Sequence, residues 1–144
     1  MNLFGILEVS GSALGAERWR AEVAASNMAN AESTRTEGGG PYRRRELIFR
    51  ASRMEPFSAT LASFGKPASP GVQVDGVIDD PTPPIRRYQP GHPDADAEGY
   101  VSYPAIDPID EMVDLMGATR AYEFNASAVQ ATKSMIQQSL EILH

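Results

Sequence analysis

The stretch that decides the fold runs from Pro108 to Leu143 and reads PIDEMVDLMGATRAYEFNASAVQATKSMIQQSLEIL. Within it a seam alternates three- and four-residue steps, which is the spacing of a helix that packs along another helix. The seam has ten positions: Met112, Leu115, Thr119, Tyr122, Ala126, Val129, Lys133, Ile136, Leu140 and Leu143. Eight of them are apolar, and the two exceptions are Thr119 and Lys133. A helix over this stretch is about 54 Å long, so it needs a neighbour of similar length.

The start of this helix is well marked. Asp107 is suited to cap the helix, and Pro108 fits its first turn. Asp110 and Glu111 are predicted to favour the positive end of the helix dipole. Lys133 falls within the seam, where either its stem lies along the apolar surface or its charge fixes the register of the partner helix.

The N-terminal segment, residues 2–30, is also predicted to be helical. Its seam has six apolar members out of eight, and the eight positions are Leu3, Leu7, Ser10, Leu14, Glu17, Ala21, Ala24 and Met28. Three glycines, at positions 5, 11 and 15, each lower helix stability by about 1 kcal/mol relative to Ala, so this helix needs partners. Asn27 and Asn30 are predicted to cap its C-terminal end.

Between the helices the pattern changes to short strands separated by turns rich in proline. Residues 46–53, 71–78, 85–88 and 100–103 carry β-branched or aromatic side chains. Residues 54–70 show no period and are predicted to form a mobile loop. The expected fold is therefore mainly α with a small β part. Long N- and C-terminal helices pair as a coiled coil, with short antiparallel strands between them.

Composition excludes several classes of protein. The net charge of −6 argues against non-specific binding to nucleic acid, and the absence of cysteine excludes disulfides and cysteine-based sites. No apolar run is long enough to span a membrane. The start is a poor signal peptide, because no basic residue precedes Arg18 and Glu8 interrupts the apolar part. Residues 35–53 contain six arginines, which form either a partner for an acidic surface or a solvated loop.

One acidic turn, residues 91–100, suggests metal chemistry. Asp94, Asp96 and Glu98 match oxygen ligands of a calcium loop, but Ala105 stands where a bidentate Glu is required. His92 could join them in a zinc or catalytic site. The alternative is a structural turn in which Asp side chains accept backbone hydrogen bonds and Gly99 has a positive φ. We expect the structural turn, with no catalytic residue, metal or cofactor.

Three stretches carry a family resemblance. Residues 25–34 (ASNMANAEST) resemble the signature of flagellar rod and hook proteins, with Met28 in place of the usual Leu. Residues 91–101 (GHPDADAEGYV) and the helix from Pro108 to Met135 resemble the proximal-rod FlgC type, as does Gly40–Arg44. The likeness covers nearly the whole chain apart from residues 54–70.

The resemblance implies a structural subunit of the bacterial flagellar proximal rod, not an enzyme. Such subunits polymerise through their terminal helices and transmit torque from motor to hook. The implied partners are copies of the chain, neighbouring rod proteins and the flagellar type III export apparatus. No nucleic acid, small-molecule substrate or membrane span is expected. The implied location is the periplasmic rod of the basal body, reached without a cleaved signal peptide.

Three segments are expected to form one structural domain: an assembly helix with its signature (1–34), a strand and loop insert (35–106) and a second assembly helix (107–144). The expected assembly interface comprises Leu3, Leu7, Leu14, Ala21, Ala24, Asn27, Met28, Asn30, Met112, Leu115, Tyr122, Ala126, Val129, Lys133, Ile136, Leu140 and Leu143. One alternative is a periplasmic metal-binding or hydrolytic module centred on His92–Glu98. Another is a coiled-coil adaptor unrelated to flagella.

Overall fold

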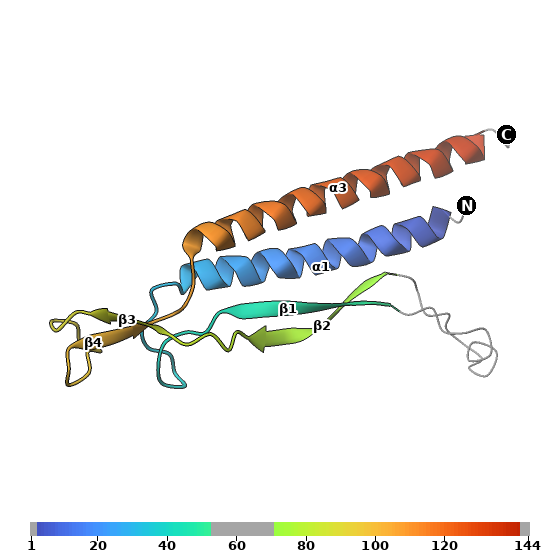
Figure 1. Cartoon of the computed structure of the whole chain (residues 1–144). Coiled ribbons are helices and arrows are strands. Elements are labelled where there is room, and N and C mark those ends of the chain that lie inside the picture. The colour runs from blue at the N-terminus through green and yellow to red at the C-terminus, as the bar shows by residue number, and fades with distance from the viewer. Residues whose placement is uncertain (1–2, 53–70, 142–144) are drawn as a thin grey trace, which may run out of the picture. The chain divides into compact units, whose positions relative to one another are not determined.

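The computed structural model describes residues 3–52 and 71–141. It contains two long helices and four short strands (Figure 1): α1 (Leu3–Ala29), β1 (Arg45–Ala51), β2 (Val72–Asp79), β3 (Ile85–Tyr88), β4 (Tyr100–Tyr103) and α3 (Pro108–Glu141). The prediction of a mainly α fold with a small β part is confirmed. The segment predicted to be a mobile loop, residues 54–70, lies outside the described residues.

Helix α3 begins where its sequence predicts and runs for 34 residues. The carboxylate Oδ1 of Asp107 accepts a hydrogen bond from the backbone N–H of Ile109 at 2.8 Å. The carbonyl oxygen of Asp107 accepts the N–H of Glu111 at 3.2 Å. Asp107 is therefore the N-cap, since its side chain satisfies a backbone donor that the first turn leaves unpaired.

The strands form two separate antiparallel sheets of two strands each, β1–β2 and β3–β4. Backbone hydrogen bonds bracket the first sheet, from Ser52 N–H to Gly71 C=O at 2.8 Å and from Asp80 N–H to Arg44 C=O at 2.7 Å. In the second sheet Ile85 lies opposite Tyr103, and the register continues to Tyr88 opposite Tyr100. In both sheets the paired strands are consecutive in the chain.

The chain forms two compact units, and each long helix contributes one segment to each unit. Unit 1 comprises Met1–Trp19, Ile48–Gly76 and Ala118–His144, and unit 2 comprises Arg20–Leu47 and Val77–Gly117. In unit 1, the hydroxyl of Ser12 on α1 accepts the N–H of Val72 at 3.1 Å. Arg50 and Asp75 form an ion pair across the β1–β2 sheet at 2.5 Å.

In unit 2, the end of α1 runs antiparallel to the start of α3. Arg20 donates to Asp114 at 3.1 Å, and Asn27 donates to Glu111 at 3.0 Å, so residue numbers rise along one helix as they fall along the other. The apolar core of this unit is small. It is made by Tyr42, Val101, Tyr103, Ile106 and Ala24. Polar contacts therefore have a large share in holding the unit together.

The β3–β4 hairpin closes through the acidic turn. Oδ1 of Asp96 accepts the N–H groups of Glu98 at 2.9 Å and of Tyr100 at 2.8 Å. Gly99 has a φ of 84°, as its sequence context predicts. A Cβ added at Gly99 would lie 2.9 Å from a ring carbon of Tyr88, so both conformation and space require glycine here.

Replacing Gly99 with Ala should destabilise unit 2 by about 2 kcal/mol, because it combines left-handed strain with a steric clash. The matched control is Gly91→Ala, at a glycine of the same turn whose added Cβ meets nothing within 4 Å. Urea unfolding followed by circular dichroism measures both. Equal stability of the two variants would contradict the assigned conformation of Gly99.

Candidate functional site

The centre of unit 2 is the side-chain amide of Asn27, which is 1% exposed. Its Oδ1 accepts the backbone N–H of Arg45 at 2.9 Å, and its Nδ2 donates to the backbone C=O of the same residue at 2.9 Å. The amide therefore pairs with β1 as the peptide group of a neighbouring strand would. Because Arg45 offers one donor and one acceptor, the pairing also fixes which way the amide points.

The two remaining hydrogen-bonding positions of this amide are also used. Nδ2 donates to Oε2 of Glu111 at 3.0 Å, and Oδ1 accepts from the hydroxyl of Tyr42 at 3.1 Å. The prediction that Asn27 caps α1 is wrong, since its side chain joins three elements instead. Asn30 fits the capping role, because its Nδ2 donates to the C=O of Ser26 at 2.9 Å.

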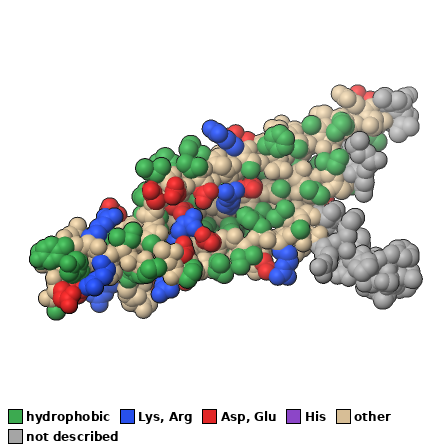
Figure 2. Space-filling view, in the orientation of Figure 1, with side chains coloured by type: hydrophobic (Ala, Val, Ile, Leu, Met, Phe, Trp, Pro, Cys, Tyr) green, Lys and Arg blue, Asp and Glu red, His purple; other side chains and the backbone are tan. Residues whose placement is uncertain are grey.

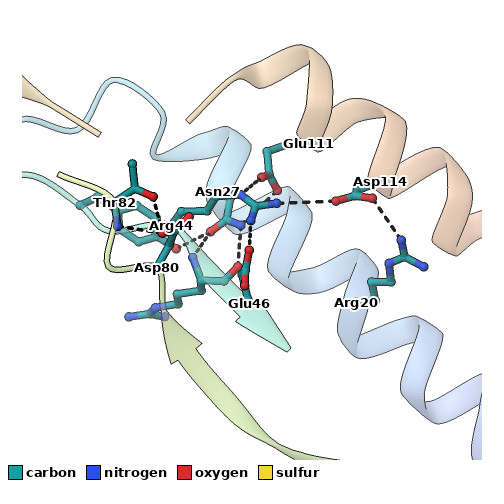
Figure 3. Close-up of polar contacts among 10 residues, drawn as sticks. Arg20, Asn27, Arg44, Glu46, Asp80, Thr82, Glu111 and Asp114 are labelled. Carbon is teal, nitrogen blue, oxygen red and sulfur yellow. Dashed lines mark hydrogen bonds and ion pairs between the residues drawn. The ribbon is translucent and has the colours of Figure 1, made fainter. Parts of the chain in front are cut away.

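Glu111 carries the second half of the site and is only 2% exposed. Its Oε1 accepts from Nε of Arg44 at 2.5 Å. Arg44 also pairs with Glu46 and lies 3.7 Å from Asp114, which is the residue that Arg20 binds (Figure 3). We call Asn27, Tyr42, Arg44 and Glu111 the polar node. A buried carboxylate is tolerated here because a cation and an amide both satisfy it.

The electrostatics of the node favour its charged form. Burial alone would lower the pKa of Arg44, but the hydrogen bond and negative charge of Glu111, with a further contribution from Glu46, outweigh it and raise that pKa. Arg44 therefore stays charged. Nearby, Thr82 donates its hydroxyl and its N–H to Asp80 and lowers the pKa of that carboxyl.

The side chains of the acidic turn are occupied by contacts within the protein. Asp94 accepts the hydroxyl of Thr34 at 2.8 Å, and Arg86 pairs with Asp96 and lies 3.8 Å from Glu98. Nδ1 of His92 accepts the N–H of Asp94 at 3.1 Å. Across residues 3–52 and 71–141, no group of three or more metal-binding side chains is placed to hold an ion. These contacts are those of a structural turn.

The structure places the expected interface residues at different depths. Ala24 and Asn27 are buried. Half-buried are Leu7, Leu14, Ala21, Met28, Asn30, Leu115, Ala126, Val129 and Ile136. Exposed are Met112, Tyr122, Lys133 and Leu140. Leu143 lies outside the described residues, and the side chain of Leu3 is not among those described.

On α3 the least exposed face is offset by one residue from the predicted seam. Its members are mostly small or polar: Glu111, Asp114, Ala118, Ala121, Asn125, Ala128 and Thr132, none of which is exposed. One residue corresponds to a rotation of about 100° around the helix. Much of the apolar seam is therefore left facing solvent in the single chain, because small and polar side chains take the inward positions.

Sequence reasoning missed the partners within the node. It assigned Glu111 to the helix dipole, counted Arg44 among the six arginines of residues 35–53, and included Tyr42 only in the family likeness of Gly40–Arg44. The contact between Asn27 and Glu111 joins residues 84 positions apart. The only signal in the sequence was the pair of acidic residues, Asp110 and Glu111, in the first turn of the helix, and that pattern suits many solvated helices equally well.

These features define a structural subunit with helical ends, in which polar groups satisfy one another inside and apolar side chains remain outside. None of the described helices is both long and apolar enough to cross a membrane. Residues 97–142 match the family described as flagellar basal body rod FlgEFG protein C-terminal.

Curated relatives cover the chain almost completely. It is 43% identical to the flagellar basal-body rod protein FlgC of Bacillus subtilis (strain 168), with 99% of each chain covered. It is 39% identical to FlgC of Yersinia enterocolitica, over 99% of this chain and 98% of the relative, and 38% identical to that of Borreliella burgdorferi, over 99% of each. The chain belongs to the FlgC family of flagellar basal-body rod proteins. It is a structural subunit of the rod, not an enzyme.

Replacing Asn27 with Ala should destabilise unit 2 by about 3 kcal/mol or more, because several buried polar groups lose their partner. Asn27→Asp should be similarly harmful despite its shape, since its second oxygen would face the carboxylate of Glu111. Asn30→Ala is the control and should cost no more than about 1 kcal/mol. Urea unfolding compares the three. An Asn27→Ala protein as stable as the control would disprove the importance of the node.

Acid should loosen the β3–β4 turn. The N–H of Tyr100, and with it Arg86 and the N–H of Glu98, lower the pKa of Asp96. A lowered native pKa adds stability that is present above the unfolded value, about 3.9, and lost as pH falls through the native pKa. The protection of the Tyr100 amide against exchange, relative to an unfolded chain at the same pH, should therefore fall in that range. In Asp96→Asn the pH dependence should flatten, and an unchanged profile would contradict the assignment.

Proposed function

We propose that this rod subunit polymerises through the faces of α1 and α3 that it leaves exposed, and so transmits torque from motor to hook. Its neighbours in this proposal are copies of itself and other rod proteins. The flagellar type III apparatus exports it without a cleaved signal peptide, and the periplasmic rod is its location. The expected interface residues belong to this proposal, as does the single domain formed by segments 1–34, 35–106 and 107–144.

The observation that carries the proposal is the number of large apolar side chains at the surface of α3. Near its start lies an outer stripe formed by Ile109, Met112, Val113 and Met116, and Phe124 and Leu140 are exposed farther along. Figure 2 shows hydrophobic side chains at the surface of the face it draws. A helix normally hides such residues, so a contiguous exposed set marks an interaction surface.

The spacing of the outer stripe supports a helical contact. Ile109, Met112, Val113 and Met116 follow the i, i+3, i+4, i+7 pattern of one helix face. A partner that buries these four side chains would gain about 1.5–3 kcal/mol for each that becomes fully buried. Contacts of this size, repeated around a polymer, suffice for assembly while leaving the lone subunit soluble enough to be exported.

Export is consistent with a subunit that has little stability of its own and gains stability from its neighbours. A chain that passes the export apparatus largely unfolded benefits from a small internal core, and only seven hydrophobic residues are buried among those described. Most of the stabilisation of the terminal helices would then come from neighbours at the growing end of the rod. The ion pairs and hydrogen bonds of the node would stabilise unit 2, which has no large apolar core.

Val113→Asp should leave the subunit folded and exported but abolish rod formation and swimming. Val113 is 58% exposed in the single chain, so the charge is harmless until a neighbour removes it from water. Ile136→Asp, which places a charge at a half-buried position of the seam, should also abolish rod formation. Complementation of a strain that lacks the rod subunit, with swimming and secreted protein as readouts, measures both.

Gln130→Asp is the control, because it places the same carboxylate at an exposed polar position of α3. This control should swim normally. If Val113→Asp and Ile136→Asp also swim normally, α3 is not the assembly surface. Failure of export in these variants would show instead that the damage precedes assembly.

A further inference from the structure

The first turns of α3 bury an acidic side chain and expose large apolar ones, which is the reverse of the usual arrangement in a helix packed on a protein core. Ile109 is 70% exposed and Met116 is 47% exposed, whereas Glu111 is buried. Asp114, one turn farther on, is half-buried beside Arg20. Burial of apolar area alone would favour a rotation of α3 that turns the outer stripe inward and the two acids outward.

Contacts on the inward side oppose that rotation. Glu111 is bound by Asn27 of α1 at 3.0 Å and by Arg44 beside β1 at 2.5 Å. Turning α3 by a single residue, about 100°, would carry the carboxylate away from both donors. Arg44 would then keep a charge in a partly buried place without its main partner, which is costlier than leaving apolar side chains in water.

The apolar inward contacts offer little resistance of their own. In this part of unit 2 the buried or half-buried apolar positions of α1 are mostly alanines, at Ala21, Ala24 and Ala25, with Val23 and Met28 as the two larger side chains. Alanine surfaces are smooth, so they accept more than one rotation of a neighbouring helix at similar energy. The polar contacts therefore have the larger part in fixing the direction that α3 faces.

We infer that the polar node sets the rotation of α3 and so determines which face the subunit presents to its neighbours. Glu111 is the positioning residue, and Asn27 and Arg44 are its anchors. Buried polar groups are known to trade stability for a single register in paired helices, which is the same physical role. The use of the presented face in assembly rests on the proposed function, but the rotation itself does not.

Single cysteines can report the rotation, because the chain contains no cysteine of its own. Met116→Cys places a thiol on the outward face, and Ala118→Cys places one at a position that is 0% exposed. Two residues correspond to about 200°, so the thiols lie on nearly opposite faces of α3. In the isolated subunit a maleimide should label position 116 at least about tenfold faster than position 118.

The test variant removes the ion pair and replaces it with apolar side chains of similar volume, Arg44→Met with Glu111→Leu. Such replacements often leave stability unchanged. The expected result is retained helix content with a labelling ratio that falls to within about twofold. The matched control is Arg43→Met with Asp110→Leu, which makes the same two changes at the adjacent exposed positions and should keep the ratio.

Every outcome decides the matter. A folded test variant that keeps the wild-type labelling ratio overturns the inference. A test variant that loses its helix content also overturns it, because the node would then hold the unit together without selecting a face. If the ratio collapses as expected while Val113→Asp rods assemble normally, the node sets the rotation but the outer stripe is not the assembly surface.

Discussion

One buried amide organises unit 2. Asn27 pairs with both backbone groups of Arg45 and donates to Glu111, so the end of α1, the start of β1 and the start of α3 meet at a single side chain. An amide suits this place because it is a donor and an acceptor without charge. Aspartate would repel Glu111, and an apolar residue would leave β1 unpaired at its first residue.

The node also explains why the start of α3 can turn an acidic side chain inward and leave large apolar side chains exposed. Because Asn27 and Arg44 hold Glu111 on the inward side of α3, the helix cannot rotate to bury the outer stripe without breaking these contacts. In a free-standing domain the exposed outer stripe would be a disadvantage, because exposed apolar area promotes association. Rod proteins assemble with other rod components, and in the assembly proposed above the cost in the single chain becomes a gain when neighbouring subunits cover these side chains.

Most polar positions of the stretch that resembles the rod and hook signature, residues 25–34, have a physical role in this structure. Ser26 lies 3.3 Å from the hydroxyl of Tyr42, and Asn30 binds the carbonyl of Ser26 and the hydroxyl of Ser33. Thr34 donates to Asp94 in the acidic turn. These residues therefore form local hydrogen bonds that end α1 and tertiary ones that connect its end to Tyr42 and to the acidic turn.

The sequence by itself determined the elements and, to within two residues, their ends. The strands predicted at 46–53 and 71–78 span Arg45–Ala51 and Val72–Asp79 in the structure. The N-cap at Asp107, the glycine conformation at position 99 and the strand limits depend on neighbours within a few residues, and those neighbours can be read directly. Only the tertiary structure decided the partner of Asn27, the burial of Glu111 and the one-residue offset of the inward face of α3. These depend on contacts between distant segments, and helical periodicity cannot distinguish a face that packs within the subunit from one that is left for a neighbour.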